Sequence, residues 1–431
     1  MPSNSLDISN FAPTIADGLQ VDLPRMMPVR QGFPEDHVAD IEAAVRRQLG
    51  QFSGLDLGGK KIAVTAGSRG IKGMVEVLRA VVAELKDRGA EPFLVPAMGS
   101  HGSGTAEGQI AVMEKLGMSE AAIGAPVRSS MDVVELGTIA DGTRVFWDKL
   151  AYQSDGIVVC NRIKAHTAFS GEYESGLVKM MVIGLGKHRG ATALHQLGFD
   201  NFHHAVPAAG KVVLANAPIL FGVGVVENAY GQMAAIEGIA PDRIMERESE
   251  LLGYSKAIMG RIQLDDIDVL IVDEIGKDVS GGGMDPNVTG RSALGLAIEN
   301  TPSIQRIIVR DLTQATAGSS MGLGMADFTT KRCAEKIDLA VTYTNALTAL
   351  VLLPPKIPMI CESDQAALAF ALRTARLQHP DGARIVRIKN TKDLENIWVS
   401  EAYRTDLSGR DEMRISGDTK PIRFDDAGNL V

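Results

Sequence analysis

Short runs of apolar, often β-branched residues that end in glycine-rich loops are the feature that most constrains this chain. Residues 61–65 (KIAVT) lead into the loop AGSRG, and residues 74–85 then carry apolar side chains at helical spacing. Residues 92–96 (PFLVP) and 156–160 (GIVVC) also run into polar loops. Buried strands that alternate with helices predict a largely parallel α/β sheet. Such sheets bind ligands in the loops that follow their strands.

The same pattern restarts after residue 261 and indicates a second α/β region. Residues 267–272 (IDVLIV) are expected to form a buried strand that leads into a loop with three consecutive glycines. Further strands are expected at 304–309, 339–343 and 357–360, and Ser363 is expected to begin a helix that runs to about Arg376.

These elements predict an α/β protein with two domains and largely parallel sheets. Residues 1–263 are expected to form an N-terminal catalytic domain that binds a cofactor, and residues 264–400 a C-terminal α/β domain. Residues 401–431 are polar and charged, and they are expected to form a tail that packs back or stays loose. The active site is expected in the cleft between the two domains.

Composition excludes several classes of protein. The chain has 44 Lys and Arg against 53 Asp and Glu, so no overall basic field exists to attract nucleic acid or an anionic membrane. Its three cysteines are not paired in CxxC motifs, which argues against a disulfide framework or a zinc ribbon. Residues 1–20 lack the apolar core of a leader peptide, and no uncharged run is long enough to span a membrane. We expect a soluble, cytoplasmic protein.

Histidines gather at the loops that follow the predicted strands. Five of the eight histidines lie between residues 166 and 204. His101 lies in a glycine-rich loop after residues 92–96, and His166 lies in the loop after residues 156–160. Two histidines on neighbouring loops can act as an acid/base pair on opposite faces of a substrate. The adjacent pair His203 and His204 is interpreted as structural, because neighbouring residues on a helix point in different directions.

Lys179 lies in an unusual setting for a lysine. Its neighbours in GLVKMMVIG, residues 176–184, are apolar. One interpretation is a lysine whose stem packs while its ammonium reaches water. The other is a desolvated amine that is used for covalent attachment, since burial lowers the pKa of an amine and exposes its lone pair.

Together these motifs resemble the lactate racemase family. The family has a histidine in a glycine-rich loop, matched here by residues 99–102 (GSHG). A second family histidine precedes an aromatic-Ser-Gly loop, matched by residues 165–171 (AHTAFSG), and the cofactor-attachment lysine follows, matched by Lys179. In the family the nickel-ligating histidine comes sixteen positions after that lysine, which here is His195. His188, nine positions after Lys179, is the competing nickel ligand.

The resemblance implies a cofactor and a role for each matched residue. The cofactor is a nickel-pincer nucleotide that is attached covalently through Lys179, with His195 as the ligand to nickel. His101 and His166 would be the catalytic acid/base residues, and Arg69 would bind the substrate carboxylate. The cofactor-binding set is completed by Ser68, Lys187 and His188, of which the last two suit a phosphate contact.

Two departures from the family pattern bear on the substrate. An Asp-His-Thr-Arg-Pro loop is typical of the family, whereas this chain has AGSRG at residues 66–70, which keeps the arginine and loses the aspartate. In the second domain, Gly290 and Ala293 replace a glutamine and a lysine. Arg291 or Lys277 is expected to supply the missing charge. The changes favour a 2-hydroxy acid larger or more polar than lactate, such as a sugar acid or a hydroxy dicarboxylate.

The expected activity is that of a racemase or epimerase that inverts the Cα of a 2-hydroxy acid. As the resemblance implies, a hydride leaves Cα and returns by way of a planar 2-keto acid, so no negative charge builds beside the carboxylate. The expected partners are the substrate and the enzymes that make the cofactor. Two alternatives stay open. One is a hydrolase or lyase with a divalent metal on His166, His188 or His195, and the other is a non-catalytic ligand-binding homologue.

Overall fold

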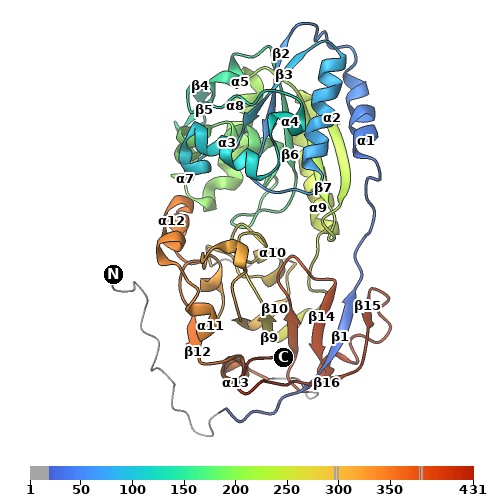
Figure 1. The fold of residues 1–431 in the computed structure, drawn as a ribbon, viewed down its shortest axis with the longest axis vertical. Coiled ribbons are helices and arrows are strands. Elements are labelled where there is room, and N and C mark those ends of the chain that lie inside the picture. The colour runs from blue at the N-terminus through green and yellow to red at the C-terminus, as the bar shows by residue number, and fades with distance from the viewer. Residues whose placement is uncertain (1–18, 296–297, 299, 378, 380–381) are drawn as a thin grey trace. The chain divides into compact units, whose positions relative to one another are not determined.

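The computed structural model describes residues 19–295, 298, 300–377, 379 and 382–431, and the chain forms two compact units (Figure 1). One unit is continuous and consists of Pro34–Met259. The other consists of Gly260–Val431 and the segment that precedes Pro34. Within the described part of the chain, no helix combines the length and apolar character that a membrane crossing requires.

A five-stranded sheet forms the centre of the unit Pro34–Met259. Its order is β3 (Glu91–Pro96), β2 (Lys61–Ala66), β6 (Gly156–Arg162), β7 (Ile219–Glu227) and β8 (Met233–Ile239). The first four strands are parallel, and β8 pairs with β7 in the antiparallel direction. The chain passes from β2 to β3 on one side of β2 and returns to β6 on the other. The carboxyl ends of β2 and β6 are therefore the switch point at which open α/β sheets bind ligands.

Helices cover both faces of this sheet. Ile62 and Val64 lie on the face that packs against α1 (Ile41–Leu49) and α2 (Met74–Asp87). Ala63 lies on the opposite face, in the core formed with α8 (Phe202–Asn216) and α9 (Ile244–Ile258). Strands that are buried on both faces require the continuous apolar sequence seen in β2 and β3.

Shorter elements complete this unit and mostly follow local sequence signals. Thr105 begins α3 (Ala106–Lys115), since its side chain accepts a hydrogen bond from the Gly108 N–H. The remaining elements are α4 (Glu120–Ile123), the hairpin of β4 (Val133–Thr138) and β5 (Arg144–Asp148), and α5 (Lys149–Tyr152).

The second unit contains a nine-stranded mixed sheet. Five strands are parallel, in the order β12 (Met359–Cys361), β11 (Phe328–Thr330), β10 (Ser303–Val309), β9 (Asp266–Val272) and β13 (Ile385–Ile388). Antiparallel strands extend the sheet from β13 through β14 (Asn396–Ser400), β1 (Arg25–Gln31) and β15 (Met413–Ile415), and β16 (Lys420–Pro421) pairs with β1. Helix α13 (Asp364–Thr374) packs on one face of this sheet.

The first segment of the chain differs from the sequence analysis, whereas residues 401–431 follow one of its two alternatives and pack back. That analysis placed residues 1–263 in the first domain, but β1 lies between β14 and β15 in the second sheet, with Met27 and Val29 fully buried. Residues 401–431 do not form a loose tail, because β15 and β16 pair with β1. The sequence of residues 25–31 does not show which distant strands they pair with, and this is why the segment was assigned to the wrong unit.

A strand predicted at residues 339–343 is instead the start of helix α12 (Leu339–Ala349). The run LAVTY suits a strand, and a short apolar run cannot be assigned to helix or strand by periodicity alone. The deciding signal is Asp338, whose carboxylate accepts a hydrogen bond from the Val341 N–H and caps the helix.

An ionic cluster holds the end of the chain against the parallel strands of the second unit. Arg310, which follows β10, forms ion pairs with Asp273 and Asp364 at 2.7 Å each. Its guanidinium also donates to the backbone carbonyl of Leu430 at 2.8 Å. The Arg310 side chain is only 11% exposed, so water screens these charges weakly.

Arg310→Met should therefore lower the free energy of unfolding of this unit by about 2–3 kcal/mol, because Asp273 and Asp364 each lose one of two cationic partners and keep only Arg387 and Arg332. Only two tryptophans are present, Trp147 in the continuous unit and Trp398 in this one. Urea unfolding of a Trp147→Phe background, followed by Trp398 fluorescence, isolates the change. Arg30→Met removes the exposed pair with Glu395 and should cost less than about 1 kcal/mol. Equal losses in both variants would contradict this account.

Candidate active site

Three loops meet at the carboxyl edge of the first sheet. They follow β2, β3 and β6, which are adjacent strands, and they carry Ser68 and Arg69, His101, and His166 respectively. The loops also bond to one another. The Ala97 N–H donates to the Ala66 carbonyl at 2.8 Å, and the Ser68 hydroxyl contacts His101 Nδ1 at 2.5 Å. The parallel register of the strands thus brings together residues that are about a hundred positions apart in the sequence.

Lys179 and His195 lie on consecutive helical segments beside these loops. Lys179 ends α6 (Leu177–Lys179), η3 (Met180–Gly184) continues it as a π-helix, and α7 (Lys187–His195) follows. Within η3 the Leu185 N–H reaches the Met180 carbonyl, five residues earlier in the sequence. Single π-turns inside helices are rare overall, and many of those that occur lie at functional sites.

Glycine permits the close approach of this helix to the strand ends. A Cβ at Gly184 would lie 2.7 Å from the Ala97 carbonyl oxygen. A Cβ at Gly176 would lie 2.1 Å from a carboxylate oxygen of Glu248. The Glu248 carboxylate accepts a hydrogen bond from the Val178 N–H at the start of α6. Both distances are too short for any side chain, so the glycines of residues 176–184 set the depth at which Lys179 lies.

Lys179 and His166 are in direct contact. Lys179 Nζ lies 2.5 Å from His166 Nε2, and the other ring nitrogen, Nδ1, accepts a hydrogen bond from the Ala168 N–H at 3.0 Å. The loop that carries His166 is held by Glu174, which accepts from the His166 N–H at 2.6 Å and the Gly171 N–H at 3.1 Å. The attachment lysine and one of the predicted catalytic histidines therefore share one site.

Positive groups dominate the electrostatics around this pair. Burial and, to a smaller extent, the nearby charge of Arg69 lower the pKa of Lys179 to about 7, although Glu174 opposes the shift. Burial also holds the pKa of His166 well below its usual range, and the charges of Lys179, Lys164 and Arg69 add to that effect. At neutral pH the imidazole is therefore neutral, as a general base must be before it accepts a proton.

His195 is oriented as a metal ligand would be. Its Nδ1 lies 2.7 Å from the Ala191 carbonyl oxygen, which can only accept, so Nδ1 carries the proton and Nε2 carries the lone pair. Burial lowers the pKa of His195, and the charge of Lys179 adds to this, which keeps the ring neutral. Phe199 and Phe202 pack against it, with ring centroids at 5.5 and 5.3 Å.

His101 and Arg69 meet through Ser68. Arg69 Nη1 lies 3.3 Å from the Ser68 hydroxyl, which in turn contacts His101. Burial and the neighbouring Arg162 lower the pKa of Arg69, but a guanidinium remains charged at neutral pH. His188 is exposed beside Gly104, in the loop of His101. The roles of all these residues remain predictions.

Lys187 has a structural position, and its assignment to cofactor binding is corrected. The side chain is fully buried, and Nζ lies 2.8 Å from Asp148 Oδ2, 2.6 Å from the Pro96 carbonyl and 3.3 Å from Gln109 Oε1. An ammonium has three donors, and three oxygens occupy them. Nothing remains for a phosphate.

Arg291 is occupied in the same way, and its assignment to substrate binding is also corrected. Its guanidinium forms an ion pair with Asp327 at 2.7 Å and donates to the carbonyls of Met325 and Gln305. The group therefore ties strand and loop segments of the second unit together. Lys277 Nζ donates to Asn345 Oδ1 on α12, and it remains a candidate contact for a substrate.

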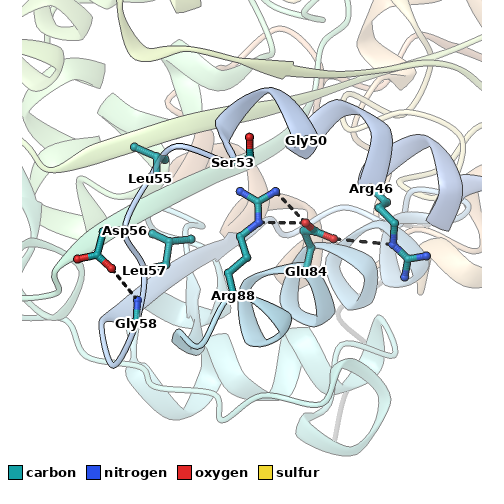
Figure 2. Close-up of a pocket in the computed structure, with 9 residues that line it drawn as sticks. All are labelled: Arg46, Gly50, Ser53, Leu55, Asp56, Leu57, Gly58, Glu84 and Arg88. Atoms are coloured by element: carbon teal, nitrogen blue, oxygen red, sulfur yellow. Dashed lines mark hydrogen bonds and ion pairs between the residues drawn. The ribbon is translucent and has the colours of Figure 1, made fainter.

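The adjacent histidines, clusters of metal ligands and a surface hollow were also compared with the predicted site. The adjacent side chains His203 and His204 do not diverge as predicted, since their ring centroids are 3.9 Å apart on the exposed side of α8. Among the described residues, no three His, Cys, Asp or Glu side chains converge as a metal site requires. The hollow in Figure 2, about 560 Å³, lies beside the ion pairs of Glu84 with Arg46 and Arg88, and none of the predicted site residues lines it.

Two buried glutamates at the site were missed in the sequence. Glu174 orders the loop of His166, and nothing in its local sequence distinguishes it from a surface residue. Glu248 lies on the buried face of α9 with Ile244 and Leu251, and its Oε2 accepts from the Val178 N–H at 2.7 Å. A carboxylate at an apolar helical position was a readable signal for Glu248.

The geometry defines a class of protein: a two-unit α/β protein with a cationic lysine and histidine site at the switch point of a parallel sheet. The family model for the lactate racemase N-terminal domain matches residues 34–205. This part of the chain is therefore similar to a lactate racemase N-terminal domain, and it includes every candidate residue of the unit Pro34–Met259.

Among solved structures, the chain is similar to the lactate racemase apoprotein from Thermoanaerobacterium thermosaccharolyticum. The two share 13% sequence identity with a TM-score of 0.49, and the match covers 86% of this chain and 99% of that one. A search of curated proteins gives no match.

Burial raises the pKa of Glu248 to about 8, which makes stability depend on pH. Below its ordinary value of 4.5, the folded and unfolded chains both hold the proton. As pH rises towards 8, only the unfolded chain loses it, so stability should fall on the order of 1 kcal/mol per pH unit across that window.

Glu248→Gln should flatten this dependence and exceed the wild type in stability at pH 8.5, since the amide oxygen still accepts from Val178. Urea unfolding followed by Trp147 fluorescence in a Trp398→Phe background measures it. An unchanged slope in Glu248→Gln would show that Glu248 is not the group responsible.

Proposed function

We propose that this protein is a racemase or epimerase that inverts the Cα of a 2-hydroxy acid and depends on a nickel-pincer nucleotide bound through Lys179. The observation that carries the proposal is the contact of Lys179 with His166, beside Arg69 and His195, within a lactate racemase N-terminal domain. Each of these groups meets a separate chemical need.

The residues present fit such a cofactor. Attachment needs an amine with a lone pair, and the pKa of Lys179 lies at about 7. A nickel ion that takes its other donors from the cofactor needs one protein ligand, and His195 presents the lone pair of Nε2. The surrounding cations suit a nucleotide phosphate. When bound, the cofactor would supply the hydride acceptor and donor.

The chain's own residues would bind the substrate and move its proton. Arg69 would bind the substrate carboxylate through a bidentate pair of hydrogen bonds, so that only the reacting carbon reorients. His101 and His166 would exchange the hydroxyl proton, each for one enantiomer. His166 is neutral at neutral pH because burial and neighbouring cations oppose its protonation.

The substrate class is proposed to be a hydroxy acid larger or more polar than lactate. Gly290 and Ala293 stand where the family has a glutamine and a lysine, so the contacts that those two side chains make with a small substrate would be missing here. Arg291 cannot compensate, because Asp327 and backbone carbonyls occupy its guanidinium. Lys277 is the remaining candidate for a second anionic or hydroxyl group.

A divalent-metal hydrolase or lyase is less well supported. That chemistry needs about three protein ligands and an open position on the metal. The described residues offer no such cluster, and His195 faces a lysine and aromatic rings instead. A ligand-binding homologue without turnover would still load the cofactor, and the substrate experiment below separates it from an enzyme.

Co-expression with the enzymes that make the cofactor should add a nucleotide-sized mass to the chain, with about one nickel ion per chain. Intact-mass and metal analyses of one sample measure both. Lys179→Ala should lose the added mass, and His195→Ala should keep it but lose most of the nickel. Lys211→Ala, an exposed lysine of the same unit, is the matched control and should keep both. A Lys179→Ala chain that still carries the adduct would refute the attachment site.

The loaded protein should racemise its substrate with retention of the hydrogen on Cα. A substrate with deuterium at Cα, incubated in ordinary water, should keep most of its label while the optical rotation decays. This follows because a hydride returns to the carbon it left, whereas an abstracted proton exchanges with water. Complete loss of label at the rate of racemisation would overturn the hydride route. No racemisation of any tested hydroxy acid by fully loaded protein would favour the ligand-binding homologue.

A further inference from the structure

The hydrogen bonds of His166 fix which of its nitrogens carries a proton. The backbone N–H of Ala168 points at Nδ1 from 3.0 Å and can only donate. Nδ1 must therefore present its lone pair. A neutral imidazole has a single N–H, so in His166 that proton lies on Nε2.

The same reasoning then fixes the state of Lys179. Nε2 of His166 lies 2.5 Å from Lys179 Nζ, which is hydrogen-bonding distance. An ammonium group has three donors and no lone pair, so it cannot accept the Nε2 proton. Two donors cannot share this contact, and it forms only when Nζ is a neutral amine that accepts from Nε2–H.

We propose that His166 is a positioning residue for covalent attachment at Lys179, because its Nε2–H holds the lysine side chain as a neutral amine. This role comes in addition to the part that His166 is proposed to play in proton transfer. It rests on the proposed function only for the identity of the group that is attached.

The charged groups around Lys179 act in the same direction, with one exception. Arg69, from the loop after β2, disfavours an ammonium, and burial lowers the pKa of Lys179 to about 7. Glu174, from the loop after β6, favours the ammonium. His195, from α7, is neutral because burial lowers its pKa. The Nε2–H of His166 is the one contact that requires the amine form outright.

Acylation of Lys179 would remove the acceptor of the hydrogen bond between His166 Nε2–H and Lys179 Nζ. The amine nitrogen forms a bond to the acyl carbon of an activated ester, the ester C–O bond breaks, the leaving group departs with the electron pair, and the surplus amine proton passes to solvent. The nitrogen lone pair is then delocalised in the new amide and no longer accepts a hydrogen bond. The Nε2–H of His166 therefore no longer has an acceptor on Lys179.

The test uses the unmodified full chain and N-hydroxysuccinimidyl acetate as the acylating probe. Rates of acetylation at Lys179 and at exposed Lys211 are followed by peptide mass analysis across pH 5.5–10. The rate at Lys179 should level off with a midpoint near 7, whereas an ordinary lysine titrates near about 10.4. His166→Phe, which removes the donor, should raise the Lys179 midpoint by about one pH unit. His166→Gln, which restores an N–H donor, should hold it near the wild-type value.

The proposal would be overturned if the pH midpoint of Lys179 acetylation were the same in His166→Phe as in the wild type. It would also be overturned if His166→Gln raised that midpoint as much as His166→Phe does. Nitrogen NMR of the histidine rings in the wild-type chain gives a second measurement that needs no variant. It should show His166 as the Nε2–H form at pH 7, and an Nδ1–H form would overturn the proposal. Neither experiment uses nickel or the nucleotide, so both results stand whether or not the racemase assignment survives.

Discussion

The parallel register of β3, β2 and β6 is the constraint on which the candidate site depends. These strands end side by side, so the loops that follow them must share one edge of the sheet. The π-helical turn after Lys179 then packs against the same edge through Gly184, which leaves no room for a side chain. A shift of one residue in any of these strands would send alternate side chains to the other face of the sheet and separate the loop residues from Lys179.

The candidate site at this edge of the sheet has more basic than acidic side chains. Arg69, Lys164 and Lys179 lie close enough to depress the pKa of His166, and Glu174 is the acidic group that acts on Lys179. Such a concentration of cations costs free energy in the folded chain and is offset when an anion binds. Burial and these charges explain why the pKa values of Lys179 and His166 are both lowered, and an anionic ligand would relieve the repulsion.

Much of the fold and part of the site could be predicted from the sequence. The strands of the first sheet are continuous apolar runs, so residues 61–65 and 156–160 were readable, as were the loops that bear His101 and His166. Pairing between distant segments was not readable, and β1 was therefore assigned to the wrong unit. Lys187 and Arg291 look like ligand contacts in a sequence, but only the coordinates show the buried oxygens that saturate them. The hydrogen bond from Ala168 that sets the tautomer of His166 depends on loop geometry that no sequence motif encodes.

The place of β1 in the second sheet has a consequence for synthesis of the protein on the ribosome. The unit that carries Lys179 is one uninterrupted stretch, Pro34–Met259, and it has all of its strands as soon as that stretch has emerged. The other unit begins with β1 but cannot pair it until β14, β15 and β16 are made near the end of the chain. During translation this seven-residue strand stays without its neighbouring strands, and an unpaired strand edge can pair with the wrong partner. The unit that carries Lys179 is thus the one that can fold early, and β1, the first of the described strands, is among the last to be paired.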